Sequence, residues 1–469
     1  MIPRSLSLVA LLALAGCDMA PRYVRPAMPV PAALPAAGDG AATANPADVA
    51  WRDFFVDDRL RRLIALALDN NRDLRVAVAN VAAARAQYHV QRAGILPTIG
   101  VSGAPTYQKT PAGLGSVAST AGQAAGSATR ADIYQANVGV SAWEIDLFGR
   151  IRDLTKASQE QFFAVQENRN AAQTALVAEV ATAWLTLAAD QDRLRLAQDT
   201  AKAYGETYRL TQARFANRVA SELEVRQAQT SYDSARADIA QTRTQVAQDT
   251  NALNLLAGTT VAADMVPQEL SDATRDALPE GLPSEVLLRR PDVASAEHVL
   301  RAANANIGAA RAAFFPKVSL TAAFGSLSLG LSNLFGSGSQ YWSVAPTATV
   351  PIFDFGKNQG NLRYAQATRD AQVATYEKSV QTAFREVADA LAQRANIGAQ
   401  LEAQTSQRDA AAVAYRLAEA RFREGVDPFL TTLDSQRSLY TAQQTLLSVR
   451  LTRQTNLVEL YRALGGGLT

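Results

Sequence analysis

Cysteine and histidine are almost missing from this chain of 469 residues, which has one cysteine and two histidines. A single cysteine cannot form a disulfide within one chain. His89 and His298 have no second ligand at metal-site spacing and no nucleophile elbow, so the sequence predicts no metal and no cofactor. An enzyme is therefore the weaker class of function, and both histidines are expected on a helix surface or in helix packing.

Charge of one sign is also missing, because 46 lysines and arginines are balanced by 44 aspartates and glutamates. Nucleic-acid sites need concentrated basic residues, so nucleic acid is not expected as a partner. Aromatic residues reach only 7%, although 48% of the residues are hydrophobic. Much of that content is alanine, which suits close contact between helices better than one thick core. No internal stretch is expected to be a transmembrane helix.

The N-terminus has the pattern of a lipoprotein signal. Arg4 precedes an apolar run from Leu6 to Ala15 that is too short to span a bilayer, and small residues lead into Cys17. We expect a signal peptide over 1–16 and a covalent lipid on Cys17, and the alternative is a chance cysteine in a secretory signal. Residues 17–57, rich in proline and alanine, are expected to form an extended tether.

An internal duplication organises the rest of the chain. The stretch "NVAAARAQYHVQRAGILPTIGV" from Asn80 is echoed by "VLRAANANIGAARAAFFPKVSL" from Val299, and later echoes keep a separation of 207 residues. Two unrelated helical segments would not preserve residue order together with a proline and a glycine. The first copy has 12 extra residues, which fit a Gly-, Ala- and Ser-rich loop over 108–130. The predicted segments are a first repeat (58–257), a linker (258–281), a second repeat (282–464) and a tail (465–469).

Each repeat has the same predicted order of elements: helix, strand, loop, strand, long helix, turn and helix. The long helices over 150–214 and 357–421 contain few breakers. At about 1.5 Å per residue, each would reach about 100 Å. Such lengths call for side-by-side packing of the coiled-coil type, and a purely structural coiled coil is one alternative function.

The strand regions, within 95–147 and 316–355, alternate apolar and polar residues. In "YWSVAPTATVPIF", Trp342 and Val344 alternate with Ser343 and Thr347. About ten such residues cross a membrane when tilted, so the pattern favours an outer-membrane barrel, and a half-buried soluble sheet is the alternative. Four strands cannot close a barrel, because an open edge is not tolerated in hydrocarbon. The chain is therefore expected to oligomerise.

The junction between strand and long helix occurs twice. "EIDLFGRIRD" at 144–153 and "PIFDFGKNQG" at 351–360 place an acid, an aromatic residue and a glycine in the same order. A carboxylate near a helix start favours the helix dipole, and glycine eases the turn. Gly149 and Gly356 are therefore predicted junctions, and the Asp-Phe-Gly of the second copy is not a kinase magnesium loop.

The second reversal between helices has clear end signals. Gly425 suits the left-handed end of a helix, Asp427 suits a cap for the next helix, and Pro428 suits its first turn. Beyond them, Leu430, Asp434 and Arg437 are spaced to share one helix face.

The first reversal differs from the second. Ser221 and Glu224 match an S-x-x-E capping box, but Arg218 stands where the 207-residue separation predicts glycine. Asn217 is expected to take the left-handed turn, or the tip is reshaped.

Three stretches identify a family. "LPSEVLLRRPDVASAEHVLRAANANIGAARAAFFPKVSL" (282–320), "ARFREGVDPFLTTLDSQRSL" (420–439) and the terminal "LYRALGGG" resemble the outer membrane factor family of TolC-type channels. The match is with its OprM/NodT-like lipoprotein branch, which serves RND efflux pumps. The resemblance implies a membrane β-barrel plus a long α-helical barrel, shared by a homotrimer in which four strands per chain complete a twelve-stranded barrel in outer membrane lipid. It also implies a periplasmic adaptor protein and an inner-membrane RND pump as partners, and the alternative is an exit duct for an ABC transporter.

The resemblance also assigns roles at the helix reversals. The leucine and aspartate that match Leu430 and Asp434 form rings at the closed periplasmic tip of the resembling channels, and Arg437 and Phe422 belong to the same predicted gate. Phe422 replaces a tyrosine that the family often has. In the plain alternative, Asp434 is a surface residue near a helix start. The residues expected to contact the adaptor are Arg218, Val219, Ala220 and Ser221 at the first tip and Gly425, Val426, Asp427 and Pro428 at the second.

Overall fold

The computed structural model describes residues 18–35, 49–110, 129–275 and 282–468. The chain divides into two compact units, the first formed by residues 1–25, 83–163 and 298–374 and the second by 26–82, 164–297 and 375–469. Both units take segments from both repeats, so neither repeat folds as a separate body. Cys17 and most of the loop expected over 108–130 lie outside the described residues.

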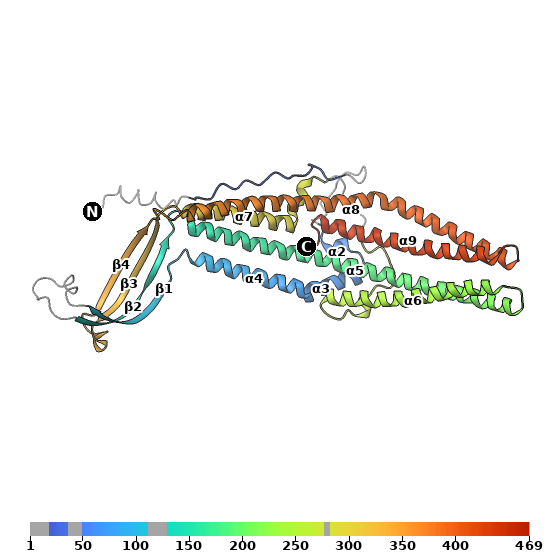
Figure 1. The fold of residues 1–469 in the computed structure, drawn as a ribbon, viewed down its shortest axis with the longest axis horizontal. Coiled ribbons are helices and arrows are strands. Elements are labelled where there is room, and N and C mark those ends of the chain that lie inside the picture. The colour runs from blue at the N-terminus through green and yellow to red at the C-terminus, as the bar shows by residue number, and fades with distance from the viewer. Residues whose placement is uncertain (1–17, 36–48, 111–128, 276–281, 469) are drawn as a thin grey trace, which may run out of the picture. The chain divides into compact units, whose positions relative to one another are not determined.

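One antiparallel sheet forms in the first unit, with the strand order β1-β2-β3-β4 (Figure 1). The strands are β1 (Ile99–Thr110), β2 (Thr129–Ile145), β3 (Lys317–Ser328) and β4 (Gln340–Thr349). The two predicted hairpins therefore join into one sheet through the pairing of β2 with β3. A 3-10 turn, η5 (Leu331–Asn333), lies between β3 and β4.

The register separates an apolar face from a polar face, as the alternation predicted. On the polar face, Ser102 Oγ donates to Asn137 Oδ1 over 2.8 Å, and Asn137 Nδ2 donates to the Tyr341 hydroxyl over 3.0 Å. The apolar rows pair Ile99, Val140, Ala322 and Val344 across the four strands, and Val101, Val138, Phe324 and Trp342.

Two helices of 67 residues each, α5 (Arg150–Ala216) and α8 (Lys357–Arg423), follow the two hairpins. These bounds confirm the two long predicted helices, because few helix breakers interrupt either segment. Each hairpin is also preceded by a helix of 22 residues, α4 (Arg72–Ala93) before β1 and α7 (Pro291–Ala312) before β3.

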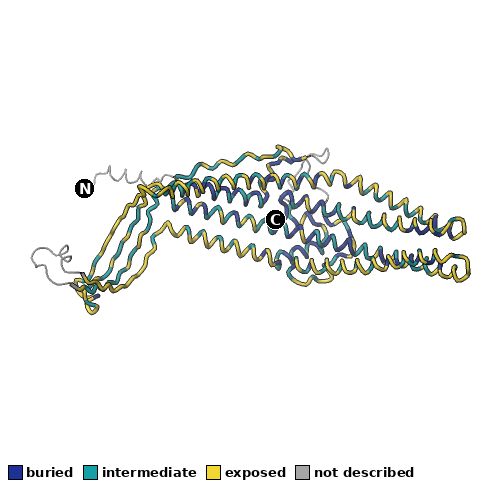
Figure 2. Tube along the Cα trace, in the orientation of Figure 1, coloured by how far each residue is buried: buried dark blue, intermediate teal, exposed yellow. Residues whose placement is uncertain are grey.

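The second unit holds the main core. Its further helices are α6 (Glu222–Ala257), α9 (Phe429–Ala463), α3 (Asp58–Asn70) and the short α2 (Trp51–Phe54), with the 3-10 turns η3 (Ala263–Met265) and η4 (Ser284–Arg289). Figure 2 shows buried residues gathered around α2, α3 and the adjoining parts of α5 and α9. Beyond this core, α5 packs antiparallel to α6, and α8 packs antiparallel to α9 (Figure 1).

The tether is shorter than predicted at its C-terminal end. Trp51, Phe54 and Phe55 are at most 2% exposed, and the Phe54 ring stacks on Tyr461 at 4.1 Å. Their large apolar surfaces fix residues 51–55 in the core instead of leaving them extended.

The backbone confirms the internal duplication. Residues with positive φ recur at a separation of 207 residues, at Gly149 and Gly356, at Arg218 and Gly425, and at Gly258 and Gly465. Each pair marks the start or end of corresponding long helices, so the two repeats share one plan of helix boundaries.

One helix, α5, contains an 18-residue window long and apolar enough to cross a membrane, with a mean hydropathy of 1.2. This window does not contradict the expectation that no internal stretch forms a transmembrane helix, because a buried packing helix passes the same test. Packing explains the result, because 56% of that window is buried inside the protein and the small apolar residues that join helices also raise hydropathy.

Candidate functional site: the sheet, its junctions and the helix tips

The two junctions have the same local geometry. Gly149 and Gly356 have φ of 80° and 83°, which strongly favours glycine. Asp146 Oδ2 accepts from the Arg152 N–H over 2.8 Å, and Asp354 Oδ2 accepts from the Asn358 N–H over 2.9 Å. The predicted carboxylates therefore cap the first turns of α5 and α8. These contacts fix the first turns of α5 and α8 immediately after strands β2 and β4.

The sheet is incomplete as a membrane structure. Strands β1 and β4 are its edges, and within the described residues neither has a second partner strand. The apolar face is uncovered, because Val101 and Trp342 are 85% and 75% exposed. An apolar face with two open edges is the surface expected of a barrel segment that neighbouring chains and lipid would cover.

The first reversal confirms the capping box and corrects the turn. Ser221 Oγ accepts from the Glu224 N–H, and the Glu224 carboxylate accepts from the Ser221 N–H over 2.7 Å. Arg218 itself takes the left-handed conformation, with φ 61°, and Asn217 does not. The Asn217 side chain instead donates to the carbonyl of Ala213 over 2.8 Å, which keeps residue 217 on the last helical turn.

The second reversal uses Asp427 differently from the prediction. Gly425 has φ 74°, as expected. Pro428 occupies the N-cap of α9, outside the helix, and no side chain caps that end. The Asp427 carboxylate binds the Arg421 guanidinium through contacts of 2.6 and 2.9 Å, and this hydrogen-bonded ion pair lowers the pKa of Asp427. Asp427 therefore closes the loop onto α8 instead of capping α9.

Phe422 belongs to a buried cluster near this reversal. It is 9% exposed and packs with Phe429, Leu433 and Ala228. The Arg214 guanidinium lies 4.6 Å from the centre of the Phe422 ring. The structure therefore places Phe422 between helices of both repeats, apart from the exposed gate residues with which the prediction grouped it.

The remaining predicted gate residues share one exposed face of α9. Leu430 is 49% exposed, and Asp434 and Arg437 are exposed too. Arg437 also donates to Ser231 Oγ of α6 over 2.9 Å, which links the neighbouring hairpin to this face. The three residues therefore share an exposed face, as their spacing predicted, while a ring of Leu430 or Asp434 side chains would need other chains.

Sequence reasoning missed how the N-terminal segment is held in the first unit. Asn304 and Arg311 of α7 donate to the carbonyls of Pro21 and Met19 over 2.7 and 3.3 Å. Gly308 lies between them, and a Cβ there would meet both Ala20 and the Asp153 carboxylate. The only signal in the sequence was that Asn304 and Arg311 are seven residues apart and so share one face of α7. No local pattern indicated that the N-terminal segment would bind to that face.

Asp153 is the unusual group of this contact. It is 3% exposed, and its Oδ2 has no hydrogen-bond partner among the described residues. Burial, together with the neighbouring Asp18 carboxyl group, raises the pKa of Asp153 to about 7. Burial disfavours the charged form, so Asp153 holds its proton more tightly than a free aspartate does.

Two further polar contacts of the second unit were also missed. Asp249 of α6 and Asp190 of α5 form a second pair of neighbouring carboxyl groups. Burial, and then hydrogen bonding to Asp190, raises the pKa of Asp249 to about 6. Arg290 lies almost fully buried and donates to Glu386 over 2.9 Å and to the carbonyl of Ala463 over 2.8 Å. All of these partners are distant in sequence, so no local pattern marks them.

The two histidines have different surroundings. His89 is exposed on α4, and His298 of α7 lies 2.6 Å from the Glu160 carboxylate of α5. Across the described ranges, no group of three or more His, Cys, Asp or Glu side chains could hold a metal ion.

Comparison with known proteins agrees with this architecture. The family model of the outer membrane efflux protein matches residues 63–259 and 282–466. The chain is 45% identical to the probable efflux pump outer membrane protein TtgC of Pseudomonas putida, over 97% of this chain and 93% of the relative. It is 42% identical to the outer membrane protein OprJ of Pseudomonas aeruginosa, over 98% and 95%.

Solved structures give the same result. The open state of the MtrE outer membrane channel of Neisseria gonorrhoeae has a TM-score of 0.85 and 37% identity, over 97% of this chain and 99% of that one. A membrane protein from Pseudomonas aeruginosa has a TM-score of 0.89 and 41% identity, over 96% and 100%. With its membrane sheet and long helices, the chain belongs to the outer membrane efflux protein family and is an outer-membrane channel that extends into the periplasm.

Proposed function

We propose that this channel is the homotrimeric exit duct of a tripartite RND-type efflux pump and that it catalyses no reaction. The observation that carries the proposal is the four-stranded sheet with open edges at β1 and β4. Backbone groups on an open edge cannot be satisfied in hydrocarbon, so β4 of one chain must pair with β1 of the next. Three chains with four strands each would close a barrel of about twelve strands, within the size range of outer-membrane barrels.

Cysteine crosslinking tests this pairing. One cysteine at Gly103 of β1, combined with a series along β4, should give a trimer-sized ladder at one register and none with either cysteine alone. A heat-modifiable trimer band should accompany it. A stable, detergent-free monomer, or crosslinks between β1 and β4 within one chain only, would contradict the proposal.

The gate is proposed on the exposed face of α9. Threefold symmetry would bring three copies of Leu430 and Asp434 around the axis, giving an apolar constriction followed by carboxylates that favour cations. Arg437, held by Ser231, would set the distance between α9 and α6 at that level. Phe422 would act indirectly, because its buried cluster supports the tip from behind.

Planar-bilayer conductance tests the gate. Leu430→Ala and Asp434→Asn should raise conductance, and Asp434→Asn should also reduce cation preference. Leu223 is the matched control, because it stands 207 residues before Leu430 and is also exposed on the helix after a reversal. Equal effects of Leu223→Ala and Leu430→Ala would show a general loosening of the tips and no gate.

Both tips are proposed to contact the periplasmic adaptor. Val219 and Val426 stand at matching positions of the two reversals and are 64% and 62% exposed. Each tip would therefore offer a partner one exposed apolar side chain at the same place. Charge substitutions at both valines should abolish crosslinking to the adaptor and drug efflux while the trimer still forms.

Cys17 is proposed to carry the lipid, which mass spectrometry of the N-terminal peptide would show.

A further inference from the structure

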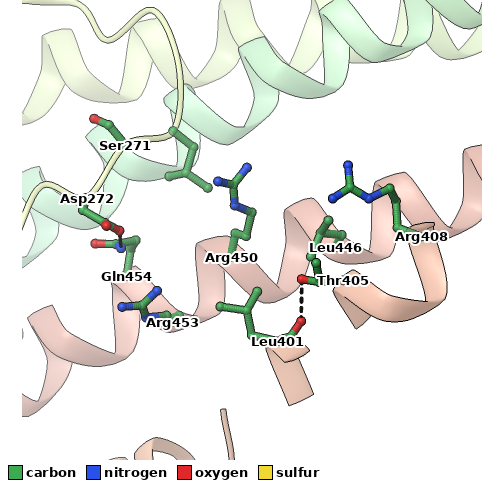
Figure 3. A pocket seen from close by; sticks show the side chains of 10 residues that line it. Ser271, Asp272, Leu401, Thr405, Arg408, Leu446, Arg450, Arg453 and Gln454 are labelled. Atoms are coloured by element: carbon green, nitrogen blue, oxygen red, sulfur yellow. Dashed lines mark hydrogen bonds between the residues drawn. The ribbon is translucent and has the colours of Figure 1, made fainter. Parts of the chain in front are cut away.

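The second unit contains a cavity of about 510 Å³ between α8, α9 and the segment after η3 (Figure 3). The Asp272 carboxylate accepts from Gln454 Nε2 over 2.5 Å, and this contact joins the segment after η3 to α9. Thr405 donates to the carbonyl of Leu401 over 2.7 Å within α8. These contacts hold the second unit together from within the chain. The first unit differs, because one of its helices has a face that the described part of the chain leaves uncovered.

The uncovered helix is α4. Among its residues 83–93 no side chain is buried, whereas the matching stretch of α7, residues 302–312, is mostly buried. The two helices correspond residue by residue, because α7 begins at residue 291 and α4 at residue 72, a separation of 219 residues, and both have 22 residues. Two helices of one duplicated plan thus have different surroundings. The contacts that cover α7 show what α4 lacks.

Helix α5 covers α7 within the chain through small apolar side chains. Ala157 of α5 packs in a buried cluster with Ala302 and Ala305 of α7, and all three are at most 7% exposed. Phe148 precedes α5 and Phe315 follows α7, and their rings stack with 4.8 Å between the centroids. We call these two contacts the internal contact. It joins residues of the first repeat to residues of the second.

The duplication supplies the positions of the internal contact a second time, on α8 and α4. Tyr364 of α8 matches the alanine of α5 and is 76% exposed. Ala83 and Ala86 of α4 match the two alanines of α7 and are exposed as well. Phe355 and Leu96 match the stacked phenylalanines, and they are 90% and 69% exposed. The chain therefore carries both halves of a second contact, and both halves are exposed.

The order of the strands places these halves on neighbouring chains. Strand β2 leads into α5 and β3 follows α7, so the pairing of β2 with β3 brings α5 beside α7. In the same way β4 leads into α8 and β1 follows α4, but these strands are the opposite edges of the sheet. If β4 of one chain pairs with β1 of the next, as the proposed function holds, α8 of one chain comes beside α4 of the next.

We propose that Tyr364 of one chain packs between Ala83 and Ala86 of the next copy of this chain, and that Phe355 packs on Leu96 of that copy. Residues three apart lie on one helix face, so the two alanines leave room for one large side chain. Aromatic anchors that fill a pocket at the centre of a contact contribute most to specific association. Phe355 has φ 55°, which is uncommon for a large residue, and such strain persists where surrounding contacts support it.

Disulfide crosslinking of the full-length chain in the membrane tests the contact. The pair Tyr364→Cys and Ala86→Cys should give dimer and trimer bands under oxidation, and either cysteine alone should give none. The pair Ala157→Cys and Ala305→Cys is the matched control, because it stands at the internal contact and should crosslink within one chain.

An exchange of side-chain sizes tests the fit without disulfides. Tyr364→Ala should make the trimer dissociate about tenfold faster in heated SDS. Ala86→Phe should do the same, because its ring would occupy the place of the Tyr364 ring. The Tyr364→Ala/Ala86→Phe variant should dissociate at close to the wild-type rate, a rescue that a purely structural role in α8 would not give. Gln359→Ala is the control and should change nothing, because Gln359 is exposed and lies about 140° around α8 from Tyr364.

Several results would overturn the proposal. They are the absence of interchain bands where the internal control pair crosslinks, unchanged dissociation of Tyr364→Ala, and a double variant that dissociates as fast as the single ones. Crosslinking of Tyr364→Cys to another protein in place of a second copy would overturn it as well. The inference rests on the proposed homotrimer, but its failure is distinguishable. Crosslinks between β1 and β4 of neighbouring chains would persist if only this helix contact is wrong, and would be missing if the homotrimer is wrong.

Discussion

The contact between the N-terminal segment and α5 should depend on pH through Asp153. Its carboxyl group is buried beside Asp18, and a Cβ at Gly308 would meet both this carboxylate and the backbone of Ala20. Other charged groups near it are Lys156, which lowers the pKa of Asp153, and Asp146, which raises it. Burial, the first cause, and Asp18, the second, dominate and raise that pKa to about 7.

The sign follows from the direction of the shift. The pKa of Asp153 is higher in the folded state than its ordinary value of 3.8, so the folded state holds the proton more tightly. The stability that protonated Asp153 gives to the contact is fully present below about pH 4 and is lost as the pH rises through 7. Between pH 5 and pH 7 this amounts to about 3 kcal/mol, because one pKa unit corresponds to about 1.4 kcal/mol. Opening of the segment should therefore increase on the order of a hundredfold between pH 5 and pH 8.

Hydrogen exchange of residues 19–25, corrected for the intrinsic effect of pH, measures this opening in the detergent-solubilised protein. The Asp153→Asn variant keeps a neutral side chain that donates to Asp18, so its protection should hardly change between pH 5 and pH 8. Asp370→Asn, at an exposed aspartate of the same unit, should behave like the wild type. An Asp153→Asn variant with the pH dependence of the wild type would refute the reasoning.

Three further outcomes are expected. Arg290→Ala should lower the free energy of unfolding by about 2–3 kcal/mol, because it leaves the partly buried Glu386 carboxylate and the Ala463 carbonyl without this buried partner, and a change below about 1 kcal/mol in denaturant unfolding would contradict this. Phe422→Ala should cost about 3 kcal/mol in the same measurement, while Phe215→Ala, at the matching position of the first repeat and 45% exposed, should cost under about 1 kcal/mol. Asp249→Asn should raise the melting temperature at pH 8 and leave it nearly unchanged at pH 4, because burial and then Asp190 raise the pKa of Asp249 to about 6 and the stability it supports is lost as pH rises through 6. A wild type that is more stable at pH 8 than an Asp249→Asn variant would disprove that assignment.

The sequence predicted the channel class well because the relevant signals are local. The alternation around Trp342 is a property of one strand, and register then carries it across the sheet through Phe324. The junction glycines and the capping box of Ser221 were also predictable, since each depends on residues within one turn. The role of Asp427 was not predictable in this way. Its carboxylate binds the Arg421 guanidinium at 2.6 Å and does not cap α9, and only the closed loop brings these two groups together.

By itself, the amino-acid sequence determined the duplicated order of elements, the lengths of the helices and the alternation of the strands, because periodicity and helix-end signals act over a few residues. Tertiary structure alone decided which distant groups meet. It placed Asp153 beside Asp18 and Arg290 on Glu386. Burial and charge at these places depend on packing between helices from different parts of the chain, and no single stretch of sequence encodes that.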